Sequence, residues 1–286
     1  MSDNPLFSVL IANFNNGRFL MEAVDSVKAQ TYPNWEIVLV DDGSTDNSHE
    51  LYKQLEQDDR IRIFYNKENK GCGYTKHQCV VNARGVYCGY LDPDDALLPN
   101  AIADLVGLLQ ADPKAALGLS RHYVCDEHLT IIHESRPLEL APGQSYFTAH
   151  SYKAEVFAAF SRDIYLAMGG LDTTCRAGVD ADLYFRLEEH GRLLISHALT
   201  YKYRIFPKSI TANWTKAFYW NLIIRHNTCL RRGLPVEKFS FADFLNFISL
   251  SHWGTRPYRI GKLLTNPRSY LRWRRQQRLI KKLKLL

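Results

Sequence analysis

Short, almost wholly apolar runs recur along the first hundred residues of this chain. Residues 7–12, 36–40 and 86–91 have the continuous apolar pattern of buried strands, and residues 60–65 alternate between apolar and polar positions. Continuous apolar runs are typical of strands that are covered on both faces. The pattern therefore predicts four strands at the centre of a layered fold.

Amphipathic stretches separate or follow these strands. Apolar residues recur at helical spacing in residues 18–30, and residues 74–84 and 98–109 also read as helices. Strands that alternate with helices form a mostly parallel sheet with right-handed crossovers, so we expect an α/β fold in which helices flank a central sheet. Ligands of such open sheets bind beyond the carboxyl ends of the strands.

Polar loops follow three of the predicted strands, with the sequences "NFNN", "DDGS" and "DPDD". The third loop places Asp92, Asp94 and Asp95 within four positions. Aspartates favour turns and helix N-caps. Taken alone, the loop is explained about equally well by such a structural role and by a role in binding a ligand. Three adjacent carboxylates repel one another, however, and Mg²⁺ or Mn²⁺ shared with substrate phosphates would relieve the repulsion. The ligand that this chemistry indicates is a nucleoside diphosphate.

The same segments carry a family resemblance. The run "SVLIANFNNGRFLMEAVDSVKAQTYPNWEIVLVDDGSTD", followed by "ENKGCGYTKHQCVVNARG" and "YLDPDD", resembles the nucleotide-binding half of the family 2 glycosyltransferases, which have the GT-A fold. The resemblance is continuous over roughly the first hundred residues. It implies that the sheet edge holds a nucleotide sugar, most often a UDP or dTDP sugar.

The resemblance assigns roles on the donor side of the site. Asp42 would accept a hydrogen bond from a uracil or thymine ring, and Phe14 would flank the base beside Ala12 on the first loop. Lys76 stands where many relatives have arginine, and its charge would face the diphosphate. Lysine supplies that charge without the bidentate fork of arginine.

The acidic loop would hold the metal ion. By the resemblance, Asp92 would reach the ribose or the metal, and Asp94 and Asp95 would reach the metal. The cofactor is expected to be Mn²⁺ or Mg²⁺, since both prefer oxygen ligands. The sequence leaves open which of Asp94 and Asp95 binds the ion directly.

A later segment, "GVDADLYFRLEEHG" at residues 178–191, also carries acidic residues of interest. It predicts a helix with Asp180 and Asp182 in its first turn. The segment resembles the family pattern "EDYDLWLRL". By this resemblance Asp180 would be the general base of a single inverting displacement, whereas we interpret Asp182 as structural. The glutamate that usually precedes the base is Val179 here, and a histidine frequent among relatives near the metal is replaced by Phe206.

Charge is distributed unevenly along the 286 residues. The chain has 36 basic and 30 acidic residues, a net charge of +6, yet residues 256–286 hold eleven Lys and Arg and no acid, so residues 1–255 carry −5. Such asymmetry indicates a polyanionic partner, either nucleic acid or an anionic membrane. Trp and Leu are interleaved with the cations, which favours a helix lying on anionic lipid.

Chain length allows one large domain with an appendage. We expect residues 1–100 to form the nucleotide-sugar-binding half of a GT-A domain, residues 101–215 its acceptor-binding half, and residues 216–286 a helical basic C-terminal extension. The N-terminus is acidic where a secretory signal is basic, and no run approaches the ~18 apolar residues of a membrane span. The six cysteines form no CxxC pair. We therefore expect a cytoplasmic protein, peripheral on the inner face of the cytoplasmic membrane.

These observations predict a metal-dependent inverting glycosyltransferase. It would move a sugar from a UDP or dTDP sugar to a hydroxyl of a saccharide or lipid-linked saccharide acceptor, in the synthesis of cell-surface polysaccharide. Two alternatives remain at this level. Val179 and Phe206 are compatible with a non-catalytic nucleotide-sugar-binding module, and the basic tail alone is compatible with nucleic-acid binding, although no nucleic-acid motif accompanies it and we expect no such partner.

Overall fold

The computed structural model describes residues 4–149, 156–206 and 214–236. The chain divides into two compact units, Met1–Asn221 and Leu222–Leu286. All described strands, and the helices α1 to α7, belong to the first unit. The residues from 237 onward, which hold most of the predicted basic extension, lie outside the described part.

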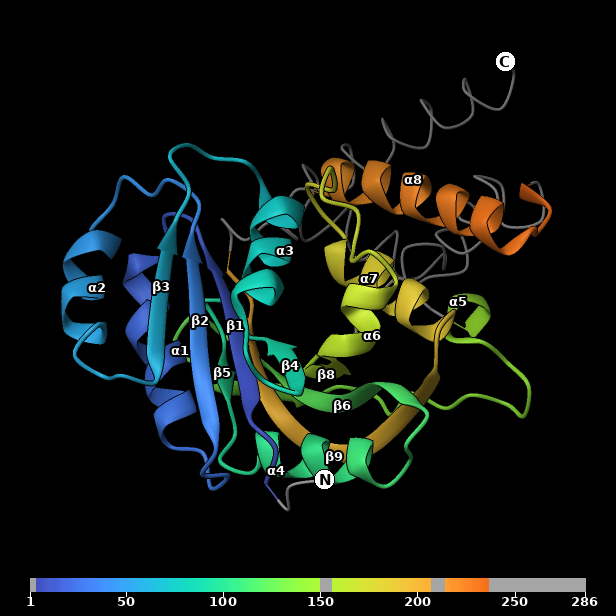
Figure 1. The fold of residues 1–286 in the computed structure, drawn as a ribbon, viewed down its shortest axis with the longest axis horizontal. Coiled ribbons are helices and arrows are strands. Elements are labelled where there is room, and N and C mark those ends of the chain that lie inside the picture. Colours follow the sequence, from blue (N-terminus) through green and yellow to red (C-terminus); the bar gives the residue numbers. More distant parts are fainter. Residues whose placement is uncertain (1–3, 150–155, 207–213, 237–286) are drawn as a thin grey trace, which may run out of the picture. The chain divides into compact units, whose positions relative to one another are not determined.

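The first half of the sheet is parallel. Its strands lie in the order β3-β2-β1-β4, with bounds β1 (Phe7–Asn13), β2 (Trp35–Asp41), β3 (Ile61–Tyr65) and β4 (Tyr87–Tyr90). The four predicted strands are confirmed to within one residue at each end. β2 is buried along its whole length, because helices cover both faces of this part of the sheet (Figure 1).

The second half of the sheet is mixed. Next to β4 the order continues β8-β6-β9-β5. β8 pairs antiparallel with both β4 and β6, and β6 pairs parallel with β9. β5 pairs antiparallel with β9, and β7 pairs antiparallel with β6. The bounds are β5 (Ala96–Leu97), β6 (Ala115–Cys125), β7 (Ile131–Glu134), β8 (Ala158–Ser161) and β9 (Arg192–Arg204). The predicted α/β class is confirmed, and these later strands add the antiparallel pairs.

Helices cover both faces of the sheet (Figure 1). One face is covered by α1 (Gly17–Lys28), α2 (Ser48–Leu55) and α4 (Ala101–Gln110), whose apolar side chains share one core cluster with β1 and β2. The other face carries α3 (Cys72–Asn82), α6 (Arg162–Ala167) and α7 (Val179–Glu188). Each large apolar side chain that is fully buried in this way contributes roughly 1.5–3 kcal/mol to folding.

Two elements complete the description: the short α5 (Tyr146–Ala149) and the helix α8 (Trp214–Arg232). Within the described residues, no helix combines the length and the apolar character that crossing a membrane requires. The three predicted helices of the first half are confirmed to within three residues. α3 begins directly after Gly71, whose φ of 96° is a conformation that favours glycine.

Candidate active site

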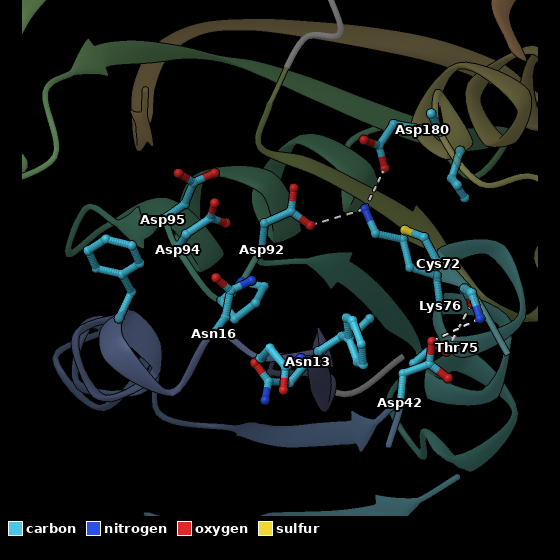
Figure 2. A pocket seen from close by; sticks show the side chains of 18 of the residues that line it. Asn13, Asn16, Asp42, Cys72, Thr75, Lys76, Asp92, Asp94, Asp95 and Asp180 are labelled. Carbon is cyan, nitrogen blue, oxygen red and sulfur yellow. Dashed lines mark hydrogen bonds and ion pairs between the residues drawn. The ribbon is translucent and has the colours of Figure 1, made fainter. Parts of the chain in front are cut away.

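A cavity of about 800 Å³ opens at the carboxyl edge of the parallel strands (Figure 2). Its walls are the loops that follow β1, β2 and β4, the start of α3, and the segment that leads into α7. The eight site residues predicted from the sequence all line it: Ala12, Phe14, Asp42, Lys76, Asp92, Asp94, Asp95 and Asp180. Loops that are up to 168 positions apart in the sequence therefore meet in one place.

Asp42 fixes the segment that follows β3. Oδ1 of its buried carboxylate accepts from the backbone N–H of Lys70 and from Nδ2 of Asn66, both at 2.8 Å, and Oδ2 accepts from the N–H of Gly71 at 2.8 Å. A carboxylate has about four lone-pair directions, so one remains for a ligand donor. Phe14, a residue that is 44% exposed to solvent, lines the same cavity.

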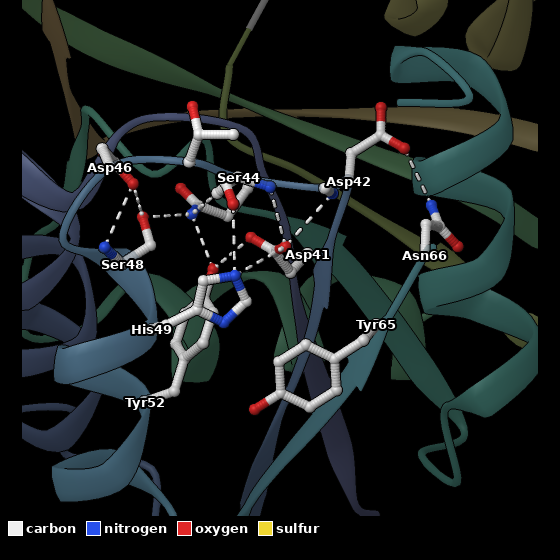
Figure 3. Close-up of polar contacts among 12 residues, drawn as sticks. Asp41, Asp42, Ser44, Asp46, Ser48, His49, Tyr52, Tyr65 and Asn66 are labelled. Atoms are coloured by element: carbon white, nitrogen blue, oxygen red, sulfur yellow. Dashed lines mark hydrogen bonds and ion pairs between the residues drawn. The ribbon is translucent and has the colours of Figure 1, made fainter. Parts of the chain in front are cut away.

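Asp41, the neighbour of Asp42, has a structural role, because its carboxylate accepts hydrogen bonds from its own loop and from α2 (Figure 3). Its Oδ2 accepts from the N–H of Gly43 and of Ser44, and its Oδ1 accepts at 2.6 Å from the hydroxyl of Tyr52. The same hydroxyl accepts from Nδ2 of Asn13 at 2.7 Å. Burial, followed by the hydrogen bond to Asp41, raises the pKa of Tyr52, which keeps its proton. The first aspartate of "DDGS" therefore shapes the loop that presents the second.

Lys76 joins two carboxylates inside the cavity (Figure 2). Its ammonium Nζ lies 2.8 Å from Oδ1 of Asp180 and 3.2 Å from Oδ1 of Asp92. The lysine side chain is 5% exposed, whereas those of Asp180 and Asp92 are 24% and 39% exposed. Burial pulls the pKa of Lys76 down, but Asp180 and Asp92 together raise it well above its ordinary value, so the amine stays charged.

Asp94 and Asp95 lie in different environments. Asp95 is buried; its Oδ2 accepts from the hydroxyl of Tyr201 and its Oδ1 from the N–H of Arg204, both at 2.7 Å. Burial, then Asp94 and Asp92, raise the pKa of Asp95 well above its usual range. The half-buried Asp94 faces the cavity, and its pKa is raised to about 6 by burial and by the charge of Asp92.

The acidic loop fits a partial metal site. Among the described residues, no group of three or more His, Cys, Asp or Glu side chains converges into a complete cage. Mg²⁺ and Mn²⁺ commonly take only one or two protein carboxylates and fill their remaining positions with substrate phosphates and water. Asp92 and Asp94 supply this number of carboxylates from one wall of the cavity, and a cation there would relieve the repulsion that raises the pKa of Asp94.

Arg204 holds the acidic loop in place through hydrogen bonds to Asp94 and Asp95. The sequence did not predict this role. Its Nε donates to the backbone carbonyl of Asp94, and its NH2 group pairs with Oε2 of Glu22 on α1. The guanidinium lies 4.2 Å from the ring centroid of Phe19, which also contacts Phe206 with 5.3 Å between centroids. Phe206, which stands where relatives often have histidine, thus forms part of an apolar cavity wall.

Asp182 has the structural role that its position predicts. Its buried Oδ2 accepts from the N–H of Asp172 at 2.7 Å and from Nε of Arg186 at 2.8 Å. By contrast, Oδ2 of Asp180 makes no hydrogen bond within the described residues, whereas its Oδ1 accepts from Lys76. One oxygen of Asp180 is thus available to an acceptor hydroxyl.

Further cavity residues were missed by sequence reasoning, among them Asn69, Cys72, Thr75 and Arg176. A signal existed for two of them, since Cys72 and Thr75 lie within one helical turn of Lys76. Burial raises the pKa of the Cys72 thiol to about 11, so it stays protonated near neutral pH and is a poor nucleophile. The charged chemistry of the cavity therefore rests on its aspartates and basic side chains.

The chain has a parallel βαβ half with an acidic edge, and a mixed half that adds the carboxylate of Asp180 to the same cavity. This combination defines a protein of the GT-A class. The family model described as "Glycosyl transferase family 2" matches residues 8–169, more than half of the chain. The chain therefore belongs to glycosyl transferase family 2.

Two curated relatives illustrate the similarity. An uncharacterized glycosyltransferase of Rickettsia typhi is 27% identical over 214 residues, which are 73% of this chain and 66% of the relative. Glycosyltransferase GlyG of Streptococcus pneumoniae is 37% identical over 125 residues, 43% of this chain and 41% of the relative. The chain thus spans less than two thirds of the length of these relatives.

Solved structures confirm the fold. The structure of S. aureus TarS 1–349 in complex with UDP-GlcNAc has a TM-score of 0.68 with this chain at 16% sequence identity, and the match covers 91% of this chain and 75% of that one. A second TarS 1–349 structure gives a TM-score of 0.65 at 17% identity, with 90% and 74% covered. The GT-A fold predicted from the sequence is confirmed.

Proposed function

We propose that this chain is a metal-dependent, inverting glycosyltransferase that uses a UDP or dTDP sugar as donor. The acceptor would be a hydroxyl of a saccharide or of a lipid-linked saccharide, in the synthesis of cell-surface polysaccharide. The observation that carries the proposal is the placement of Lys76 between Asp92 and Asp180 in one cavity of about 800 Å³. Cavities of this size hold drug-sized ligands such as nucleotide sugars. Likeness in fold to a protein crystallised with UDP-GlcNAc supports the choice of donor.

The nucleotide would lie along the parallel edge of the sheet. Asp42 keeps one lone-pair direction for the imide N–H of a uracil or thymine ring, and the exposed ring of Phe14 offers a stacking face beside Ala12. Asp92, which is 39% exposed, can reach the ribose. The donor would then point its diphosphate toward Lys76 and the acidic loop.

Asp94, together with Asp92, would hold Mn²⁺ or Mg²⁺. We assign Asp94 the direct contact because both oxygens of Asp95 already accept hydrogen bonds inside the fold. Bound there, the ion would stabilise the negative charge that grows on the departing diphosphate. Lys76 adds a fixed positive charge in a place that is largely closed to water.

Asp180 would act as the general base. Its unoccupied oxygen would accept the proton of the acceptor hydroxyl while that oxygen forms a bond to the anomeric carbon. The bond from the anomeric carbon to the diphosphate oxygen breaks in the same step, and its electron pair leaves with the nucleoside diphosphate. A single displacement from the opposite face inverts the anomeric configuration.

We further propose that the protein works at the inner face of the cytoplasmic membrane, held by its basic C-terminal extension. The support comes from the sequence, in which eleven cations without an acid are interleaved with Trp and Leu in residues 256–286. A lipid-linked acceptor would suit that location.

A thermal-shift screen of the purified protein with UDP, dTDP and GDP sugars tests the proposed donor class. We expect stabilisation by UDP or dTDP sugars in the presence of Mn²⁺, and a smaller shift when EDTA replaces the metal. No shift with any nucleotide sugar would contradict the proposal and would also dispose of the alternative of a non-catalytic nucleotide-sugar-binding module.

A further inference from the structure

The basic side chains of the cavity differ in whether they have hydrogen-bond or ion-pair partners within the protein. Within the described residues, four line its wall: Arg18, Lys76, Arg176 and Arg204. Five carboxylates line the same cavity: Asp42, Asp92, Asp94, Asp95 and Asp180. A dianionic diphosphate that enters this acidic cavity needs positive charge beyond that of a divalent metal ion.

Three of the four cations already have protein partners. Lys76 is shared by Asp92 and Asp180, and Arg204 pairs with Glu22 while also donating to backbone carbonyls. Arg18 lies 3.5 Å from Glu127, in a pair that is exposed to solvent. Arg176, in contrast, makes no hydrogen bond or ion pair within the part of the chain that the structure describes. Its guanidinium donors are therefore available to a ligand.

The backbone around Arg176 is held firmly in place. The carbonyl of Cys175 accepts from the N–H of Gly73 at 3.0 Å, which ties the segment to α3. Asp172, at the start of the same segment, donates its N–H to the buried Asp182 of α7. Gly178 ends the segment at a φ of 67° and is the N-cap of α7. Because the backbone of the segment is already fixed, binding through Arg176 orders the side chain without also ordering a loop.

The arginine side chain lies directly over Gly71. A Cβ atom at Gly71 would fall 2.7 Å from NH1 of Arg176 and 2.8 Å from its Cζ, so the guanidinium packs closely against the backbone of Gly71. Gly71 itself donates to Asp42, and Lys76 follows one turn later on α3. Arg176 is also four positions before Asp180. The guanidinium therefore lies where a ligand that extends from Asp42 toward Asp180 would pass it.

We propose that Arg176 binds the diphosphate of the nucleotide donor, as a binding residue additional to Lys76 and the acidic loop. The inference rests on the proposed function, because it assumes that a nucleoside diphosphate occupies the cavity. A guanidinium presents five N–H donors in a planar fork that matches two phosphate oxygens, and such charge-assisted pairs are among the stronger hydrogen bonds in proteins. Arg176 would thereby supply the bidentate contact that Lys76 cannot make.

Binding of nucleotides and nucleosides to the full-length protein tests this role. Titration calorimetry with Mn²⁺ would compare UDP with uridine and dTDP with thymidine, for wild type, Arg176→Gln, Arg176→Lys and Arg192→Gln. Arg192→Gln is the matched control. Arg192 lies at the start of β9, outside the cavity lining, and its substitution removes the same charge from an exposed ion pair with Asp112. Arg176 is exposed, so its substitution is expected to leave folding intact, and circular dichroism would check this.

We expect Arg176→Gln to weaken binding of the nucleoside diphosphate about tenfold and to leave binding of the nucleoside within twofold of wild type. Arg176→Lys should fall between the two, because it keeps the charge and loses the fork. The control should bind like wild type. Equal binding of the diphosphate by wild type and Arg176→Gln would overturn the inference, as would an equal loss for nucleoside and diphosphate. If wild type binds no nucleoside diphosphate at all, the proposed function itself fails.

Discussion

The ammonium of Lys76 lies 2.8 Å from Oδ1 of Asp180, although 104 positions separate the two residues in the sequence. The contact joins α3 to the first turn of α7 and sets the cation that would face the diphosphate against the carboxylate that would take the acceptor proton. Any ligand that attracts the ammonium of Lys76 therefore changes the charge environment of Asp180. In the proposed mechanism, this pair would couple donor binding to base catalysis.

Lys76→Met should reduce both activity and stability. It leaves Asp92 and Asp180 without their shared cation, and we expect a stability loss of about 1–3 kcal/mol, between the values for exposed and buried ion pairs. Turnover of the donor should fall about 100-fold because the diphosphate loses a fixed positive charge. Urea unfolding and steady-state kinetics measure the two effects. Lys76→Arg is the charge-conserving control, and a Lys76→Met enzyme with wild-type kinetics would contradict the assignment.

Substitution of Asp95 should affect folding, whereas substitution of Asp94 should affect metal binding. Asp95→Ala leaves the hydroxyl of Tyr201 and the N–H of Arg204 without their acceptor, so we expect a loss of about 2–4 kcal/mol in the free energy of unfolding. Asp94→Ala should cost less than about 1 kcal/mol, since this carboxylate faces the cavity, but should abolish the response of nucleotide binding to Mn²⁺. Chemical denaturation measures the first effect, and metal titration in the presence of UDP measures the second. A large stability loss for Asp94→Ala and a lost Mn²⁺ response for Asp95→Ala would show that Asp95 binds the metal and Asp94 supports the fold.

Tyr52→Phe tests the loop that presents Asp42. The change removes one hydroxyl that bonds both Asp41 and Asn13 in a fully buried position, so we expect a stability loss of about 1–3 kcal/mol. Nucleotide affinity should fall several-fold as the "DDGS" loop loosens. Tyr65→Phe is a suitable control, because the hydroxyl of Tyr65 bonds only the exposed Glu56 among the described residues. Equal behaviour of the two variants would contradict the role given to the buried hydroxyl.

The basic tail should direct the protein to anionic lipid. Co-sedimentation with vesicles should show binding to phosphatidylglycerol-containing membranes and little binding to pure phosphatidylcholine, with a loss of affinity as salt rises. Replacing the lysines at 281, 282 and 284 with glutamine should weaken binding by about 1 kcal/mol per charge. Binding that does not depend on lipid charge would contradict the proposed membrane partner.

Local patterns predicted the first half of the fold well. The strands β1, β2 and β4 are almost continuous apolar runs and β3 alternates between apolar and polar positions, and turn residues such as Gly43 follow them, so each strand could be located from its own sequence. β8 and β9 were not predicted, because their pairing depends on partners far along the chain. β8 pairs with β4 through Cys88 and Phe160, and no local signal encodes such a contact.

The site shows the same division between local and distant information. Each of the eight predicted residues stands in a recognisable motif, and all eight line the cavity. The difference between Asp94 and Asp95 was not accessible, because it arises from Tyr201 and Arg204, more than a hundred positions later. Arg176 was missed for a similar reason: only the fold shows that its guanidinium lies over Gly71.

In the proposed mechanism, Asp180 activates the acceptor in a nucleotide-sugar site. Release of nucleoside diphosphate from the donor that the screen selects tests this role, when it is measured with Mn²⁺ for wild type, Asp180→Asn and Asp182→Ala. Asp182→Ala is the control because its carboxylate bonds Asp172 and Arg186 within the fold. We predict that Asp180→Asn binds the donor like wild type and releases nucleotide about 100- to 10,000-fold more slowly, whereas Asp182→Ala chiefly lowers the unfolding temperature. Release by Asp180→Asn at the wild-type rate would contradict the role of Asp180 as the base.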